Sequence, residues 1–547
     1  MINKNIIAIV FVFFLLSCGK SENISTINNK TNQQNDPPYL RLPIEGEIGT
    51  IDPGYIQDMA PIEIVEQLFL GLTDFDPKTY EVTPELATHW TVSPDGTVYR
   101  FYLRKDVFWT NGRAVTAHDV VWAIQRNISP EVECLYAYVM YIIKNAEAIH
   151  NGTIDDISQL GVYAINDYTV EFHLENPAAY FPSVAGLWIF RPLPVEIIKK
   201  YDKKWTDPEN IVTNGSYILD TWFEGSLMVL KKNPKYYDAA NVNIDEVHYH
   251  IIPESYAGLV MYKNNDLDVL GGTYLRLPLT ELNEIKIDPD LYDQYRNKPL
   301  FCTYFYGFNT KKPPVNNPLV RKAISAAVDR ELLIEVITRG DEQPATTFTR
   351  PPLFGSCDPS EGVGVGFNPK QARLWLTEAG YPDGKNFPKI SIVHNASETH
   401  SRVAKSIKSF LKYYLNIEVE VKSLEWNEYV NILDQPNTPH IFRTGWCADY
   451  PDANNWLNDV FHPRKSSNFI GWNNQEFAKL MDQAQQNNDP KIRKKLYRRA
   501  EQILCDEEAA IIPIYFETAQ YLVKKRLKGW YHMAIGGQHI RNWSLEK

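Results

Sequence analysis

The stretch Arg443-Thr444-Gly445-Trp446-Cys447-Ala448-Asp449-Tyr450-Pro451-Asp452 follows directly on Pro439-His440-Ile441-Phe442. The apolar pair Ile441-Phe442 and the residues around it predict the end of a buried strand that opens into a loop. The loop combines a fixed cation, large aromatic side chains, a cysteine and a carboxylate. Arg443 and Asp449 could hold both ends of a zwitterion, could bind two separate partners, or could form a structural salt-bridged turn beneath Trp446.

The length and charge of the chain limit the classes of protein that it can belong to. At 547 residues it is expected to contain more than one domain, with enough length to bury large cores. Its composition is ordinary for a globular protein, with 44% hydrophobic and 22% charged residues. The net charge of −11 argues against general nucleic-acid binding, because there is no basic excess to neutralise phosphates.

The amino terminus carries the pattern of a targeting signal. Lys4 precedes the apolar run Ile6–Leu16, which is shorter than the roughly 20 residues that span a bilayer. The run ends in Leu15-Leu16-Ser17-Cys18-Gly19, which resembles the lipobox of bacterial lipoproteins. That resemblance implies a signal peptide over residues 1–17, cleaved before an acylated Cys18; the alternative is an uncleaved membrane anchor. Residues 18–38 are rich in Ser, Asn, Thr and Gln, which predicts a flexible tether.

The remaining cysteines and the histidines give no pattern of a metal or catalytic site. No CxxC, HExxH or GxSxG motif occurs, so neither a metal site, a redox pair nor a serine nucleophile is indicated, and we expect no enzyme and no cofactor. In an exported protein an odd number of cysteines permits at most two internal bridges and leaves at least one thiol free. The cysteines after Cys18 are Cys134, Cys302, Cys357, Cys447 and Cys505.

Hydrophobic periodicity predicts strands early in the chain and an alternation of strands and helices later. Asp95-Gly96 is the turn of a predicted hairpin, and Thr116 with Asp119 predicts a capping box at a helix start. The alternation after residue 390 predicts a doubly wound lobe with a parallel sheet, whose strand ends bind ligand. The expected strands are 40–43, 168–174, 222–232, 301–309, 390–394, 417–424 and 440–446; the expected helices are 61–69, 116–124, 317–337, 369–379, 400–415, 426–433, 475–487 and 491–506.

Several stretches, in order along the chain, resemble the periplasmic oligopeptide-binding proteins of ABC peptide importers. One of them is Arg443–Tyr450, where Arg-x-Gly-Trp-Cys-Ala-Asp-Tyr closely matches the ligand-site loop of that family. The resemblance extends from about residue 39 to residue 540. Its other motifs are Trp90 to Arg104 with the following Trp109-Thr110-Asn111-Gly112, then Asn210–Tyr217, and Lys232-Asn233-Pro234-Lys235-Tyr236-Tyr237.

The resemblance implies an α/β fold: a two-lobed periplasmic-binding-protein fold with an additional third domain, and mixed sheets flanked by helices. Domain I, a discontinuous lobe, is expected from residues 39–75, 197–301 and 516–547. Domain II, the additional domain, is expected from 76–196. Domain III, the second lobe with the ligand loop 443–452, is expected from 302–515.

The resemblance also implies roles for individual residues. In the family the aspartate that matches Asp449 pairs with the free amino terminus of the peptide; otherwise Asp449 would cap its own loop. Arg443 and His400 are expected to contact the carboxyl terminus. The residues expected to line side-chain pockets or the ligand loop are Trp426, Tyr136, Tyr138, Trp446 and Cys447, and Cys447 is expected to form a disulfide with Cys302.

Three positions depart from the family pattern. Asp434-Gln435-Pro436 stands where a second arginine is expected, and the region of Thr338-Arg339-Gly340 lacks the lysine that meets longer peptides. Beyond Tyr450 the sequence is Pro451-Asp452-Ala453 rather than Asn-Glu-Pro. These departures leave the preferred length and composition of the peptide open.

The function implied by the resemblance is that of a binding receptor. We expect a monomeric, lipid-anchored periplasmic protein that captures short peptides in a closing interdomain cleft and delivers them to an ABC permease. Peptide backbone and termini would carry the recognition. The alternative is the same fold retuned to another ligand, such as a murein peptide, a nickel chelate or haem.

Overall fold

The computed structural model describes residues 37–338, 341–433, 435, 438–464 and 468–546. The expected signal peptide, Cys18 and nearly all of the tether lie outside this range, as do Arg339-Gly340, Asp434 and Pro436. From Pro38 onward the chain forms one unit. Among the helices of the described residues, none is long and apolar enough to cross a membrane.

The first sheet joins the beginning of the described chain to residues some two hundred positions later. Strand β1 (Leu40–Ile44) runs parallel to β10 (Glu246–Ile251), with Leu42 paired to Tyr249. Strands β9 (Leu227–Lys232) and β8 (Tyr217–Phe223) extend the sheet in the order β1-β10-β9-β8. Helix α1 (Met59–Leu68) buries Ile62, Val65 and Leu68, and the buried residues of this region form one core.

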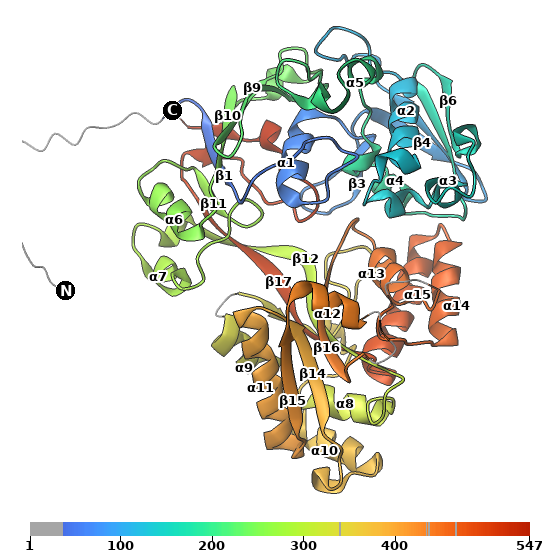
Figure 1. Cartoon of the computed structure of the whole chain (residues 1–547), viewed down its shortest axis with the longest axis vertical. Helices are drawn as coiled ribbons and strands as arrows, with labels where there is room; N and C mark the ends of the chain where they lie inside the picture. Colours follow the sequence, from blue (N-terminus) through green and yellow to red (C-terminus); the bar gives the residue numbers. More distant parts are fainter. Residues whose placement is uncertain (1–36, 339–340, 434, 436–437, 465–467, 547) are drawn as a thin grey trace, which may run out of the picture. The chain divides into compact units, whose positions relative to one another are not determined.

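A second, antiparallel sheet has the order β4-β5-β7-β6 (Figure 1). The predicted hairpin is present, with the Asp95-Gly96 turn between β4 (Ala87–Val92) and β5 (Val98–Leu103). β7 (Thr169–His173) and β6 (Val162–Asn166) complete the sheet. Helix α2 (Ala117–Ile128) packs beside it, and its predicted capping box is present, since Thr116 N donates to Asp119 Oδ2 at 2.9 Å.

The third sheet carries the strand that leads to the ligand loop, and it is mixed rather than parallel. Strand β16 (Ile441–Cys447) runs parallel to β14 (Ile390–Asn395), which runs parallel to β15 (Val419–Leu424). On its other side β16 pairs antiparallel with β12 (Tyr295–Phe308), and β12 pairs antiparallel with β17 (Ile511–Val523). The strands between residues 390 and 447 are parallel as predicted, because helical crossovers join them. The addition of β12 and β17 makes the sheet mixed, as the fold class implied by the resemblance expects.

The two long strands β12 and β17 extend past β16 within the same sheet (Figure 1). The far end of β17 pairs with β11 (Val269–Gly271), where Val523 faces Val269. The two strands therefore connect the region of β11 with the region of β16. The short β13 (Gln343–Pro344) also pairs with β17.

Helices cover both faces of the third sheet. One core contains Tyr304, Ile441 and buried residues of α8, α10 and α11; the other contains Phe305, Phe442 and buried residues of α13, α14 and α15. The helices concerned are α10 (Pro369–Glu378), α11 (Glu398–Leu415), α12 (Trp426–Leu433), α13 (Ala453–Phe461), α14 (Gln475–Gln485) and α15 (Pro490–Gln502). Helix α10 begins as predicted, because Asn368 Oδ1 accepts from Gln371 N at 3.0 Å.

Two expectations about helices were incomplete. The single helix expected over residues 317–337 is divided into α8 (Pro318–Ala326) and α9 (Arg330–Leu333). Asp329 begins the second helix, since its Oδ1 accepts from Leu332 N at 3.0 Å. Helix α13 was not predicted. Its polar residues are buried together with its apolar ones. The remaining helices and strands are α3 (Ala146–His150), α4 (Phe181–Val184), α5 (Val195–Tyr201), α6 (Ser255–Lys263), α7 (Leu282–Ile287), β2 (Thr73–Phe75), β3 (Val82–Pro84), β18 (Leu527–Lys528) and β19 (Ser544–Leu545).

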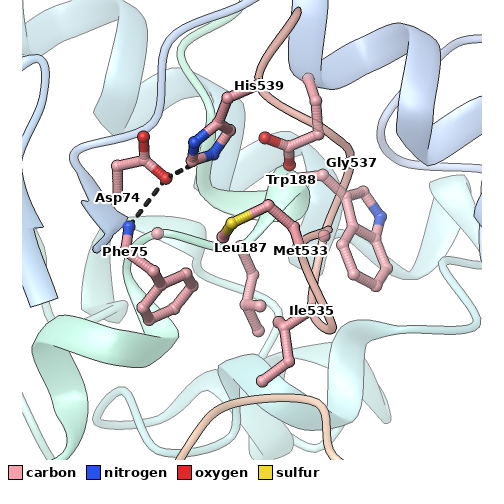
Figure 2. Close-up of a pocket in the computed structure, with 11 residues that line it drawn as sticks. Asp74, Phe75, Leu187, Trp188, Met533, Ile535, Gly537 and His539 are labelled. Carbon is pink, nitrogen blue, oxygen red and sulfur yellow. Dashed lines mark hydrogen bonds and ion pairs between the residues drawn. The ribbon is translucent and has the colours of Figure 1, made fainter. Parts of the chain in front are cut away.

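A small cavity of about 10 Å³ is lined by residues from β2, the segment before α5 and the carboxyl-terminal tail. Figure 2 shows its lining, with Asp74 between the Phe75 amide and the His539 ring. Phe75 N donates to Asp74 Oδ1 at 2.7 Å, and His539 Nε2 lies 3.1 Å from the same oxygen. The cavity is too small for a peptide, and none of the predicted site residues lines it.

Candidate functional site

Asp449 lies immediately beyond β16, at the carboxyl end of that strand, and its carboxylate accepts hydrogen bonds from two distant tyrosines. Tyr136 Oη donates to Oδ1 at 2.6 Å and Tyr138 Oη donates to Oδ2 at 3.1 Å. The rings of the two tyrosines are 5.0 Å apart, and Tyr136 packs on Trp188 at 4.6 Å. Tyr136 and Tyr138 were expected to line side-chain pockets; their hydroxyl groups instead converge on the carboxylate.

Asn455 lies in helix α13, which was not predicted, and it fixes the Asp449 loop through hydrogen bonds. Asp449 N donates to Asn455 Oδ1 at 2.9 Å, while Asn455 Nδ2 donates to Asp449 Oδ2 at 2.9 Å. Trp446 Nε1 also donates to Asn455 Oδ1, at 3.3 Å. Asn455 is 1% exposed, so this amide is a fixed part of the fold. Sequence reasoning missed Asn455; the available signal was Asp452, whose side chain accepts from Asn454 N and begins α13.

The surroundings of Asp449 disfavour an uncompensated negative charge. Burial raises the pKa of the Asp449 carboxyl above its usual value, and the nearby Asp459 raises it further. The hydrogen bonds from Tyr136, Asn455 and Tyr138 lower that pKa and so offset part of the effect. All three donors are neutral. A cationic group that reached Asp449 would therefore gain a charge-assisted hydrogen bond that the protein itself does not supply.

Cys302 and Cys447 form a disulfide that joins β12 to β16 directly before the Asp449 loop. Their sulfur atoms are 2.03 Å apart and their Cα atoms 4.0 Å apart, and the two residues face each other in the sheet register. Cys447 is exposed, whereas Cys302 is buried. Among the described cysteines, Cys134, Cys357 and Cys505 are free and buried.

Arg443 and His400 both contact Tyr304. Arg443 lies on β16, four residues before Cys447. The guanidinium carbon of Arg443 is 4.7 Å from the centre of the Tyr304 ring, and the Tyr304 hydroxyl lies 3.1 Å from His400 Nδ1. Arg443 Nε is buried without a hydrogen-bond partner among the described residues. Burial, together with Arg443, lowers the pKa of His400 to about 4. His400 is therefore neutral at pH 7 and can offer a carboxylate only a hydrogen bond.

Trp426 stands apart from the other predicted residues. It is 60% exposed at the start of α12 and packs on Tyr429, with ring centres 6.3 Å apart. The Tyr429 hydroxyl donates to the backbone oxygen of Arg443. The structure thus groups Asp449 with Tyr136, Tyr138, Trp446 and Cys447, groups Arg443 with His400, and leaves Trp426 at the surface. Among the described residues no cluster of His, Cys, Asp or Glu is arranged to hold a metal ion.

Comparisons with known proteins show the family to which the chain belongs. Residues 81–468 match the family described as bacterial extracellular solute-binding proteins, family 5, middle region. The chain is a family 5 bacterial extracellular solute-binding protein. This family 5 protein is 30% identical, over 542 residues, to the oligopeptide-binding protein OppA of Bacillus subtilis, with 98% of this chain and 97% of the relative covered.

A second relative and a solved structure extend the likeness of the family 5 protein. It is 31% identical, over 88% of each chain, to the periplasmic oligopeptide-binding protein OppA of Salmonella typhimurium. A solved structure of the periplasmic murein tripeptide binding protein MppA, in an unliganded open form, superposes with a TM-score of 0.82. In that comparison the sequences are 29% identical, and 92% of this chain and 97% of the other are covered. The expected α/β solute-binding fold is therefore confirmed.

Proposed function

We propose that this family 5 protein captures short peptides and holds their free amino terminus at Asp449. The observation that carries the proposal is the convergence of three neutral donors on one carboxylate: Tyr136 and Tyr138 from a distant part of the chain, and Asn455 from the helix that follows the loop. Such a carboxylate lacks only a cation. A peptide ammonium has the right charge, and two of the relatives are named as oligopeptide-binding proteins.

The proposal includes the division into domains. Domain I would comprise residues 39–75, 197–301 and 516–547, domain II residues 76–196, and domain III residues 302–515. Tyr136 and Tyr138 would then come from domain II and Asp449 from domain III, so that the ligand would be enclosed as the domains close. The two long strands β12 and β17 would connect the lobes.

Peptides that co-purify with the protein provide a direct test. Native mass spectrometry of the purified protein is expected to show adducts whose masses fit peptides of a few residues, released after gentle denaturation. A single murein peptide, a nickel chelate or haem as the released ligand would instead support the retuned receptor. A protein saturated with a non-peptide ligand and unable to bind added peptides would contradict the proposal.

The carboxyl terminus of the peptide would lie at Arg443, with neutral His400 as a hydrogen-bond donor. Arg443→Ala is then expected to weaken binding of free-acid peptides by about 1.5–3 kcal/mol and to change binding of the matching amides much less. Calorimetry with a series of peptides from two to five residues is expected to show a maximum of affinity in the wild type.

The control for this substitution is Arg373→Ala, which removes an exposed arginine of α10 bonded to the Tyr414 carbonyl at 2.9 Å. It is expected to leave both acids and amides unchanged. Equal losses for acids and amides in Arg443→Ala would show that Arg443 supports the Tyr304 ring rather than the ligand.

The cellular role that we infer is delivery of peptide to an ABC permease from the outer face of the membrane. The role needs no catalysis and no cofactor, and one copy of the chain would suffice. Cys18 would hold the protein to the membrane through its lipid. Intact mass measurement of protein extracted from cell envelopes tests this: loss of residues 1–17 and addition of acyl chains are expected. An unmodified amino terminus would overturn the anchor and leave peptide binding standing.

A further inference from the structure

Glu517 lies on the same face of the third sheet as the residues of the carboxylate end. On β17 it is two positions from Tyr515, so strand alternation places both side chains on one face. Tyr515 pairs with Tyr304 in the register, and their rings stack with centres 4.8 Å apart. Arg443, on β16, has its guanidinium carbon 4.7 Å from the centre of the Tyr304 ring. One sheet face thus presents two tyrosine rings, a guanidinium and a carboxylate.

The Glu517 carboxylate has no bonded partner of its own. Among the described residues, no hydrogen bond or ion pair reaches it, although Arg350 donates to its backbone oxygen. Burial raises the pKa of Glu517, whereas Arg443, Arg276 and Arg350 are close enough to lower it. None of these arginines pairs with it directly. A partly buried carboxylate in this condition would be stabilised by a cation that reaches hydrogen-bond distance.

The register also places Glu517 along the path of the proposed peptide. Phe516 pairs with Thr303 and Thr518 pairs with Pro299, so Glu517 lies opposite the irregular stretch of β12 between them, which contains Cys302, the partner of Cys447. Cys447 is two residues before Asp449 and four residues beyond Arg443. A peptide with its amine at Asp449 and its carboxylate at Arg443 would therefore cross this stretch with one of its internal residues.

We propose that Glu517 forms a subsite for a cationic side chain, lysine or arginine, at an internal position of the bound peptide. The proposal rests on the proposed function. When the carboxylate of the ligand neutralises Arg443, one of the cations close to Glu517 no longer offsets its charge. The peptides that fit best then carry an internal lysine or arginine together with a free carboxyl terminus.

The test compares Ala-Lys-Ala with Ala-norleucine-Ala, because norleucine keeps the length of the lysine side chain and lacks its charge. By calorimetry, the affinity of the wild-type protein for the lysine peptide is expected to be at least about tenfold higher than its affinity for the norleucine peptide. In Glu517→Gln this preference is expected to disappear while affinity for the norleucine peptide is retained. The preference is also expected to be larger for free acids than for amides.

Glu342→Gln is the matched control. Glu342 is another acid near Glu517, but its Oε2 accepts from the Thr338 hydroxyl at 2.8 Å. This variant is expected to keep the lysine preference. Near-ultraviolet circular dichroism of each variant is used to check that it is folded. A lysine-to-norleucine ratio that is the same in the wild type and in Glu517→Gln would overturn the subsite and leave peptide binding intact, whereas failure of both peptides to bind any variant would overturn the proposed function together with the subsite.

Discussion

Acetylating the amino terminus of a peptide is expected to weaken its binding by about 2–5 kcal/mol, the range for breaking a buried charge pair. The acetyl group removes the charge of the ammonium, and the Asp449 carboxylate is then left with neutral donors only. Because burial already raises the pKa of Asp449, that carboxylate gains more from a cation than an exposed one would. Isothermal titration calorimetry with one peptide in free and acetylated forms measures the difference directly.

The substitution Asp449→Asn tests whether this loss arises at Asp449. The variant is expected to bind free peptides weakly and to lose most of its discrimination between free and acetylated forms, since the charge partner is gone. Folding is expected to change little, because Asn455 still holds the loop through Asp449 N. Wild-type protein with equal affinity for the blocked and free peptides would remove Asp449 from the site.

Removing the Cys302–Cys447 disulfide is expected to cost the protein up to about 5 kcal/mol of stability, from the chain entropy of the long loop that it closes. The bridge spans a sequence separation of 145 residues. Residual structure in the unfolded chain usually reduces such values. The measurement is denaturant unfolding of the double variant Cys302→Ser with Cys447→Ser, compared with the wild type under non-reducing conditions.

The loss of peptide-binding free energy in this double variant is expected to be smaller than its loss of unfolding free energy. The bridge holds the start of the Asp449 loop against β12, but Asn455 also fixes the loop from α13. The control is Cys134→Ala, at a buried free thiol that belongs to the first core. Peptide mapping of unreduced protein provides an independent check: alkylation of Cys302 or Cys447 as a free thiol in folded, air-exposed material would exclude the bridge.

The two proposed contacts for the ligand termini differ in their electrostatics. Asp449 is an anion that accepts from neutral donors. Arg443 is a cation whose Nε has no hydrogen-bond partner among the described residues and whose histidine neighbour is neutral. In the ligand-free protein each charge is thus incompletely compensated. A zwitterionic peptide would compensate both at once, which explains physically why free termini would contribute more to affinity than side chains.

The features that depend on neighbouring residues could be predicted from the sequence. The hairpin turn at Asp95-Gly96, the capping box of Thr116 and the cap at Asn368 are local hydrogen-bonding patterns, and each is present. The strand that ends in the Asp449 loop was also predicted, because a short apolar run followed by polar residues indicates a buried strand that ends in a loop. The family followed from the long run Arg443–Tyr450.

Apart from the Cys302–Cys447 disulfide, which the resemblance implied and the structure confirms, contacts between distant segments were decided by the tertiary structure. Tyr136 and Tyr138 reach Asp449 from more than 300 positions away, and no local pattern marks them as donors to a carboxylate. The sheet is mixed because β12 and β17 enter it from outside the regular alternation. The role proposed for Glu517 depends on the pairing of β17 with β12, which places it opposite the stretch that contains Cys302. The physical reason is that side-chain periodicity determines which face a residue takes within its own element, whereas the partner across that face is set by strand pairing over long separations.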